Sequence, residues 1–241
     1  MIFGFSKAQK NAPAPKLRSR SQSRTTEALA GESLDHLAMN WNELTARSSY
    51  FELKLFTLLS NGVEQAPDLV LSEGLSLAAA HALRAHHDLA AELIRGGEDP
   101  VLQMQEFTKD YDEFFTRVHT DSWVELVLTA YLVGGLLGDF TRHILDAQDP
   151  RNDTLVTALN GRADSPVVRE VLMQILESSP GQADRLALWG RRLVGDVLLL
   201  CRETFRELLS DSGVASAPLQ ASLTAIIAEH TRRMDSLGLT A

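Results

Sequence analysis

The sequence predicts an all-α fold in which long antiparallel helices form a four-helix core. From Ser33 onward, apolar residues recur at helical spacing with few β-branched alternations. The breaks in this pattern carry helix start and stop signals. With 241 residues, of which 44% are hydrophobic, the chain is long enough to bury one sizeable core.

Residues 1–27 are predicted to form a disordered basic tail, and residues 28–241 one helical domain. The tail is rich in Pro, Ser, Ala and Arg and lacks apolar periodicity, so it cannot offset the entropy cost of ordering. Residues 1–25 carry six of the 23 basic residues and no acid, which leaves 17 bases against 32 acids, a net charge of −15, in the remainder. The run from Arg18 to Arg24 could contact RNA phosphates, although a solvated tail is the simpler interpretation.

Three helices are predicted in the first half of the domain. The first covers about residues 34–61 and stops at Asn61-Gly62. The second follows Pro67 and ends at Gly96-Gly97, and a shorter third helix covers about residues 101–117.

The fourth predicted helix begins with a capping box and runs to about residue 147. In this motif the hydroxyl of Ser122 and the carboxylate of Glu125 each satisfy a free N–H group of the first turn. The segment Ser122 to Glu125 has the required spacing.

The last three predicted helices contain or follow prolines. A fifth helix covers about residues 152–177 and is expected to kink at Pro166, because proline removes a backbone hydrogen bond. The sixth starts at Ser179-Pro180 and reaches about Leu209, and the last one follows Pro218 and ends near Leu237-Gly238. Four of the helices have about 25 residues or more, which suits an extended bundle.

No segment predicts export or membrane insertion. The start of the chain is too short for a signal peptide, and the longest apolar stretch, Leu126 to Leu137, is shorter than the roughly 20 residues that span a bilayer. The single cysteine, Cys201, lies in an apolar run, which favours a buried side chain. We therefore expect a cytoplasmic protein with no membrane partner.

Two helices place a potential metal ligand on a core-facing stripe. Helical bundles build two-metal sites from a Glu on each of two helices and a Glu-x-x-His motif on each of the other two. In the first helix Glu52 lies on the apolar face, and in the second helix His86 is expected to point inward. The position three residues before His86, where the motif needs Glu, is Leu83.

The fourth and fifth helices offer no such ligand on their apolar faces. The apolar face of the fourth includes Gly134, and Glu125 and Asp139 lie on roughly the opposite side. In the fifth, the stripe contains Asn160 and Ala163, neither of which is anionic or an imidazole.

Two longer stretches resemble the signatures of a known family. Residues 184–196 read DRLALWGRRLVGD, and residues 230–239 read HTRRMDSLGL. Both look like stretches of an actinobacterial family of ferritin-like proteins. That family is described as similar to the hydroxylase that modifies methylthio-isopentenyl-adenosine in tRNA, a di-iron enzyme. The resemblance covers about residues 45–241, with further matches at Tyr50 to Leu53, Ala66 to Leu69, Trp123 with Glu125, and Tyr131 through Phe140. It implies a ferritin-like four-helix bundle with additional helices.

The resemblance also assigns the ligand positions of the family to this sequence. They fall on Glu52, on Leu83 with His86, on Gly134, and on Asn160 with Ala163. Only Glu52 and His86 keep a metal-binding side chain, whereas a di-iron centre needs about six ligands. The sequence thus predicts a degenerate di-iron site with no catalytic residues and no cofactor, and iron only if the site still works. Glu52 and His86 are expected to lie within about 10 Å of each other inside the bundle.

Two functions follow from this prediction. The preferred one is a non-catalytic binding or assembly module whose partner is an unknown protein or, as a homodimer, a second copy of the chain. The alternative is a metal-dependent hydroxylase acting on a modified tRNA nucleoside or another small substrate, provided that Glu125, Asp139 or His143 enters the core. The family-like stretches also offer Arg191, Arg192 and His230 as a candidate binding surface, although basic residues on such helices are more often solvated or paired.

Overall fold

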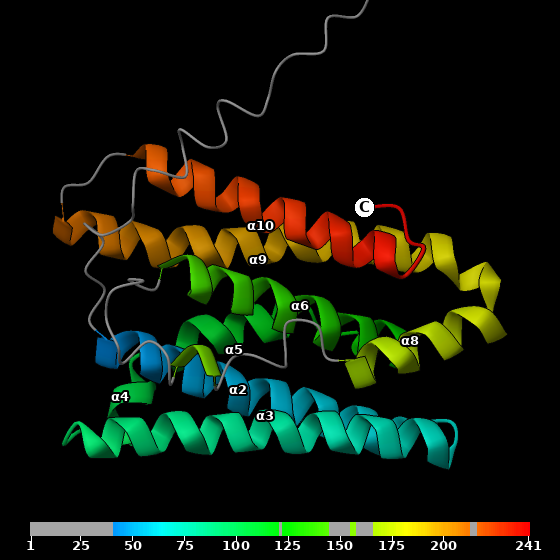
Figure 1. The fold of residues 1–241 in the computed structure, drawn as a ribbon, viewed down its shortest axis with the longest axis horizontal. Coiled ribbons are helices and arrows are strands. Elements are labelled where there is room, and N and C mark those ends of the chain that lie inside the picture. The colour runs from blue at the N-terminus through cyan, green and yellow to red at the C-terminus, as the bar shows by residue number, and fades with distance from the viewer. Residues whose placement is uncertain (1–40, 121, 145–154, 158–165, 213–215) are drawn as a thin grey trace, which may run out of the picture. The chain divides into compact units, whose positions relative to one another are not determined.

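The computed structural model describes residues 41–120, 122–144, 155–157, 166–212 and 216–241. The helices of this part are α2 Trp41–Gln65, α3 Leu69–Arg95, α4 Pro100–Gln105, α5 Thr108–Arg117, α6 Trp123–Ile144, α8 Pro166–Ser178, the short 3-10 helix η1 Pro180–Gln182, α9 Ala183–Ser212 and α10 Ser216–Ser236 (Figure 1). These described residues contain no strand, so the all-α prediction is confirmed. The predicted tail, residues 1–27, lies outside them.

Four helices form the core of the bundle. Packing runs from α2 to α3, from α3 to α8, from α8 to α6 and from α6 back to α2, which closes a ring. The short link between α2 and α3 makes them antiparallel. Helix α6 is also antiparallel to α2. Leu44 near the start of α2 lies by Thr141 near the end of α6. Gly62 near the end of α2 faces Leu126 near the start of α6.

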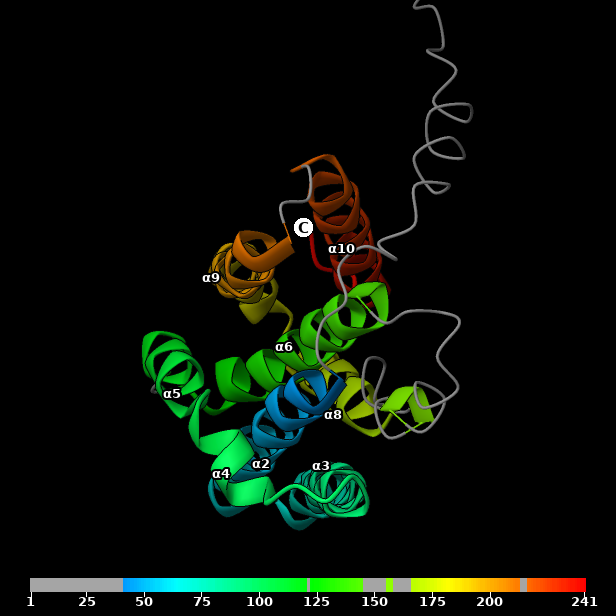
Figure 2. The same cartoon turned by 90° about the vertical axis from the view of Figure 1, so that its left-hand side faces the viewer.

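Helix α6 is the most enclosed helix of the described chain. Its other side is covered by α9 and α10, so it lies between the ring and this second layer (Figure 2). Leu128, Leu132 and Leu136 are all 0% exposed. By length and composition α6 is the one described helix that could cross a membrane, but 94% of its most apolar stretch is buried against the protein, which is also typical of a core helix.

Several predicted helix boundaries change for local reasons. The expected helix at 101–117 is two helices, α4 and α5, and α4 has its own start, because Asp99 caps it and Pro100 occupies its first turn. At the start of α6, the N–H of Ser122 donates to Thr120 Oγ1 and this hydroxyl donates to Glu125, so Thr120 takes the place of the predicted capping box.

Two further predicted boundaries were wrong by a few residues, since α2 continues through Asn61-Gly62 to Gln65 and Pro218 lies inside α10. Pro166 is the first residue of α8, a position where proline is well tolerated. The predicted kink would involve residues 158–165, which lie outside the described residues. Gly97 and Gly238, with φ values of 84° and 69°, follow the ends of α3 and α10, and only glycine adopts this backbone region without strain.

The contact between α3 and α8 gives a first testable prediction. A Cβ atom added at Gly74 would lie 2.9 Å from Cγ2 of Val171, a β-branched side chain that cannot easily rotate away. We expect Gly74→Ala to lower the free energy of unfolding by about 1 kcal/mol, because the clash outweighs the gain in helix propensity. Urea denaturation checks this value.

A matched control lies in α9. A Cβ atom at Gly190 would meet mainly the thioether end of Met234, at 2.6 Å, and a methionine side chain can move. Gly190→Ala should therefore be nearly neutral, and equal losses for both variants would contradict the explanation.

Candidate functional site

The two predicted ligands lie on neighbouring helices of the ring. Glu52 of α2 is 0% exposed, and His86 of α3 is half-buried. The Nδ1 atom of His86 lies 3.0 Å from the carbonyl oxygen of Ser49 and 3.0 Å from its hydroxyl. Because a carbonyl oxygen can only accept, this geometry fits a proton on Nδ1 and leaves Nε2 as the nitrogen with a lone pair.

His86 lies at the edge of the buried face of α3 and not at its centre. The buried residues of that helix are Leu71, Leu75, Ala78, Ala79, Ala82, Ala85, Leu89 and Leu93. The stripe is therefore centred about one residue away from the predicted one, and Leu83 and His86 flank it as half-buried side chains. A direct approach of Glu52 to His86 stays a prediction, since the hydrogen bonds described for His86 go to Ser49.

The other ligand positions of the family contribute no metal donor in the described part. Gly134 is buried in α6, and a Cβ atom at this position would already contact Leu55 at 3.4 Å. Asn160 and Ala163 lie outside the described residues. Among those that are described, no group of three or more His, Cys, Asp or Glu residues could hold a metal ion. The described residues thus do not fit a di-iron centre, which needs about six ligands.

Glu125 is buried, and it joins α6 to α9. Its side chain was expected to point away from the core, but α9 covers that side of α6, so Glu125 is only 8% exposed. Arg185 Nε donates to Glu125 Oε1 at 2.6 Å, and one turn further on Trp189 Nε1 donates to Thr129 Oγ1 at 2.8 Å. The family-like stretch 184–196 therefore fastens α9 to α6.

Asp139 links α6 to α10 through a similar ion pair. It is 3% exposed, and its Oδ2 atom lies 2.6 Å from Nη1 of Arg233, which is itself 5% exposed. Arg142 forms a second ion pair with Asp139. The prediction that Asp139 lies away from the core was wrong for the same reason, because the far face of α6 is buried under the second layer. The sequence did hold a signal, since Arg185 and Arg233 lie in the two family-like stretches.

The three residues of the candidate binding surface lie in different surroundings. Arg191 and Arg192 are exposed, and they donate to the carbonyl oxygens of Thr240 at 3.1 Å and Arg117 at 3.4 Å. His230 is 2% exposed, so in this chain it lies inside the bundle and not on a surface. Burial and the adjacent Arg233 lower the pKa of His230 to about 4.

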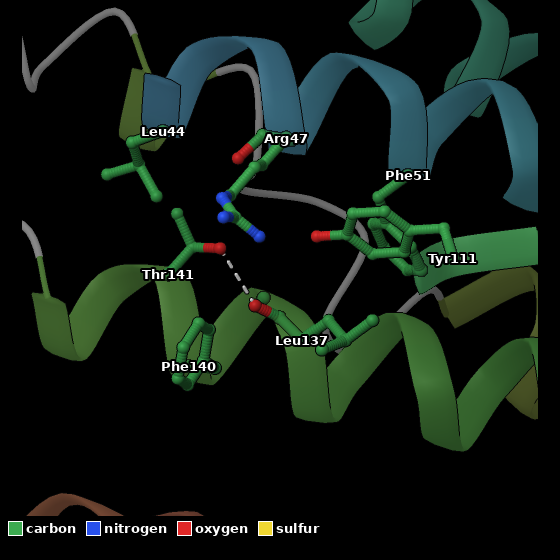
Figure 3. Close-up of a pocket in the computed structure, with 9 residues that line it drawn as sticks. Leu44, Arg47, Phe51, Tyr111, Leu137, Phe140 and Thr141 are labelled. Atoms are coloured by element: carbon green, nitrogen blue, oxygen red, sulfur yellow. Dashed lines mark hydrogen bonds between the residues drawn. The ribbon is translucent and has the colours of Figure 1, made fainter. Parts of the chain in front are cut away.

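A small pocket between α2, α5 and α6 is lined by the buried guanidinium group of Arg47. Arg47 points into it together with the hydroxyl group of Tyr111, and Thr141 lies opposite (Figure 3). Arg47 is 5% exposed, pairs with Glu43 at 2.9 Å and lies 4.1 Å from the centroid of the Phe107 ring. The space open to a water-sized sphere is about 10 Å³, roughly what one water molecule needs. An organic substrate does not fit in this pocket.

The tyrosines of this region predict an alkaline transition. Burial raises the pKa of Tyr111, and burial together with Asp112 raises the pKa of Tyr50 to about 12. Both pKa values lie above the ordinary value of 10. The contribution of the two protonated tyrosines to the free energy of unfolding is therefore fully present below pH 10 and is lost as the pH rises through 12. Thermal unfolding followed between pH 9 and 12 should show this loss, and it should shrink in Tyr111→Phe. A pH dependence unchanged by Tyr111→Phe would contradict the assignment.

Comparison with known families agrees with this architecture. Residues 38–231 match the family described as "Ferritin-like domain, actinomycetes". The ring of four helices and the match over most of the chain define a ferritin-like helical bundle, and the chain belongs to this actinomycete family. No curated protein matches the sequence.

Proposed function

We propose that this ferritin-like protein is a non-catalytic binding or assembly module. The proposal rests on one observation: the buried carboxylates of α6 are engaged in ion pairs with other helices. Glu125 and Asp139, the acids of α6, form ion pairs with Arg185 and Arg233 that hold the second layer on the ring. Carboxylates engaged in this way serve packing between helices and are not available as metal ligands without breaking those pairs.

The ligand positions of the ring support the same conclusion. Leu83 stands where the family has a carboxylate, and Gly134 has no side chain, with Leu55 in contact at 3.4 Å with a Cβ atom placed there. One carboxylate and one imidazole are too few for two irons, and even a single non-haem iron normally takes two His and a carboxylate. The competing function is a metal-dependent hydroxylase, and metal content separates the two.

The experiment is elemental mass spectrometry on full-length protein expressed in iron-supplemented medium. Three variants accompany the wild type: Glu52→Gln, His86→Asn and, as a matched control, His87→Asn on the exposed side of the same helix. Circular dichroism verifies that each variant is folded. We expect wild type and variants alike to be folded and essentially free of iron.

Near-stoichiometric iron in the wild type, lost in Glu52→Gln and His86→Asn but kept in His87→Asn, would overturn the proposal. It would then favour the hydroxylase, and a modified tRNA nucleoside would be the first substrate to test. Iron retained equally by all four proteins would place it elsewhere in the chain.

A further inference from the structure

The outer face of α9 carries apolar side chains that no part of the described chain covers. Leu188 is 63% exposed and Leu199 is 51% exposed. Their spacing of 11 residues puts both on one face of the helix, with Gly195 between them. Two leucines on one exposed stripe are a candidate contact surface for another protein.

Gly195 packs against no other part of the described chain. A Cβ atom at this position would meet no atom within 4 Å, whereas at Gly62, Gly74, Gly134 and Gly190 it would contact a side chain at 3.4 Å or less. Glycine is, after proline, the poorest helix former, so its presence in a helix interior needs a reason. Close approach of another helix at this point supplies one.

The charges on this face would complement those on the same face of a second copy. Arg192 and Asp196 lie one turn apart on either side of the Gly195 region, and within one chain their nearest atoms are 3.9 Å apart, the limit of an ion pair. If a second α9 lies antiparallel across a two-fold axis near Val194, Arg192 of each copy faces Asp196 of the other. The same register sets Leu188 against Leu199 of the second copy.

We propose that the chain forms a two-fold dimer through this face of α9, with antiparallel helices that approach most closely at Gly195. The proposal rests on the function proposed above, since it gives the assembly module a partner, a second copy of itself. Any other protein partner would need an acidic residue opposite Arg192 and a basic residue opposite Asp196. An antiparallel second copy of α9 already provides both.

Charge reversal tests the register. Sedimentation velocity of the full chain should show a concentration-dependent dimer, and Arg192→Asp should raise its dissociation constant about tenfold or more, because like charges then face each other. The double variant Arg192→Asp with Asp196→Arg restores opposite charges and should return the constant to within about threefold of the wild type. A double variant as weak as the single one would overturn the proposed register.

Crosslinking tests the position of the axis. In Gly195→Cys the two thiols should lie near enough to form a disulfide under mild oxidation, since Cα atoms about 4.4–6.8 Å apart can be bridged. The native Cys201 is 0% exposed and should stay unreacted, and Leu77→Cys, at an exposed leucine of α3, is the matched control. Crosslinking no stronger at Gly195 than at Leu77, or a monomer at every concentration, would overturn the dimer.

The two proposals can fail separately. Metal content does not depend on dimerisation, so a metal-free monomer would overturn only the dimer, and a dimer with bound iron would overturn only the non-catalytic function.

Discussion

Replacing Arg233 by alanine is expected to lower the free energy of unfolding by about 3 kcal/mol. The side chains of Arg233 and Asp139 are 5% and 4% exposed, and their charged atoms lie 2.6 Å apart between α10 and α6. Removal of the arginine leaves a carboxylate buried next to Arg142 alone, whose side chain is 32% exposed and is partly solvated. This remaining partner keeps the loss at the lower end of the range for a broken buried pair. Urea denaturation at pH 7 measures it.

The neighbouring residue provides the control. Arg232 is exposed and pairs with Glu229 on its own helix, three residues away. Surface pairs of this kind are screened by water and salt, so Arg232→Ala should change stability little. If both variants lost the same amount, the ion pair between Arg233 and Asp139 would not be what holds α10 in place.

The outcome would help to explain the residues found in the two family-like stretches, 184–196 and 230–239. Arg185 and Trp189 in the first stretch, and Arg233 in the second, all contact α6. These contacts pack the second layer against α6. A large loss in Arg233→Ala would mean that the most recognisable parts of the sequence record the architecture of the bundle.

The helices themselves were readable from the sequence because their ends carry specific chemistry. Pro67, the pair Gly96-Gly97 and the pair Leu237-Gly238 marked boundaries that the structure keeps. The break between α4 and α5 was missed, since nothing in the local pattern around Phe107 shows that the two halves pack against different neighbours. Such tertiary preferences override helical periodicity.

The faces of α6 show where single-helix reasoning stops. The sequence pattern predicts that its smallest residues face the core and that Glu125 and Asp139 lie on roughly the opposite side, because a helix at the surface of a bundle has one apolar stripe. A helix that is enclosed on all sides needs partners for its polar groups, and those partners come from α9, 60 residues away along the chain, and from α10. Spacing within α6 does not carry that information.

His230 makes the second large prediction, a loss of stability in mild acid. The pKa of this buried imidazole is lowered to about 4 from the ordinary value of 6.5, first by burial and then by Arg233. Because its folded-state pKa is depressed, its contribution is fully present above pH 6.5 and is lost as the pH falls toward 4. Between pH 7 and pH 5 the free energy of unfolding should fall by about 2 kcal/mol.

Other titratable and charged groups lie where α10 packs against α6. Asp139, Arg142 and His143 lie on α6, and Glu229 and Arg233 lie on α10. Burial also lowers the pKa of His143, so protonation of this half-buried residue destabilises the fold in the same direction. A variant that removes only one imidazole is therefore needed to assign the effect.

His230→Leu is that variant, and denaturation at pH 7 and pH 5 is the measurement. Neither ring nitrogen of His230 has a hydrogen-bond partner within the described residues, so an apolar side chain of similar size should keep the stability at pH 7 or raise it. The loss at pH 5 should then largely disappear, whereas in His81→Gln, at an exposed histidine of α3, it should remain. If His230→Leu stays as acid-sensitive as the wild type and His143→Leu does not, the acid response belongs to His143, and the burial of His230 is not its source.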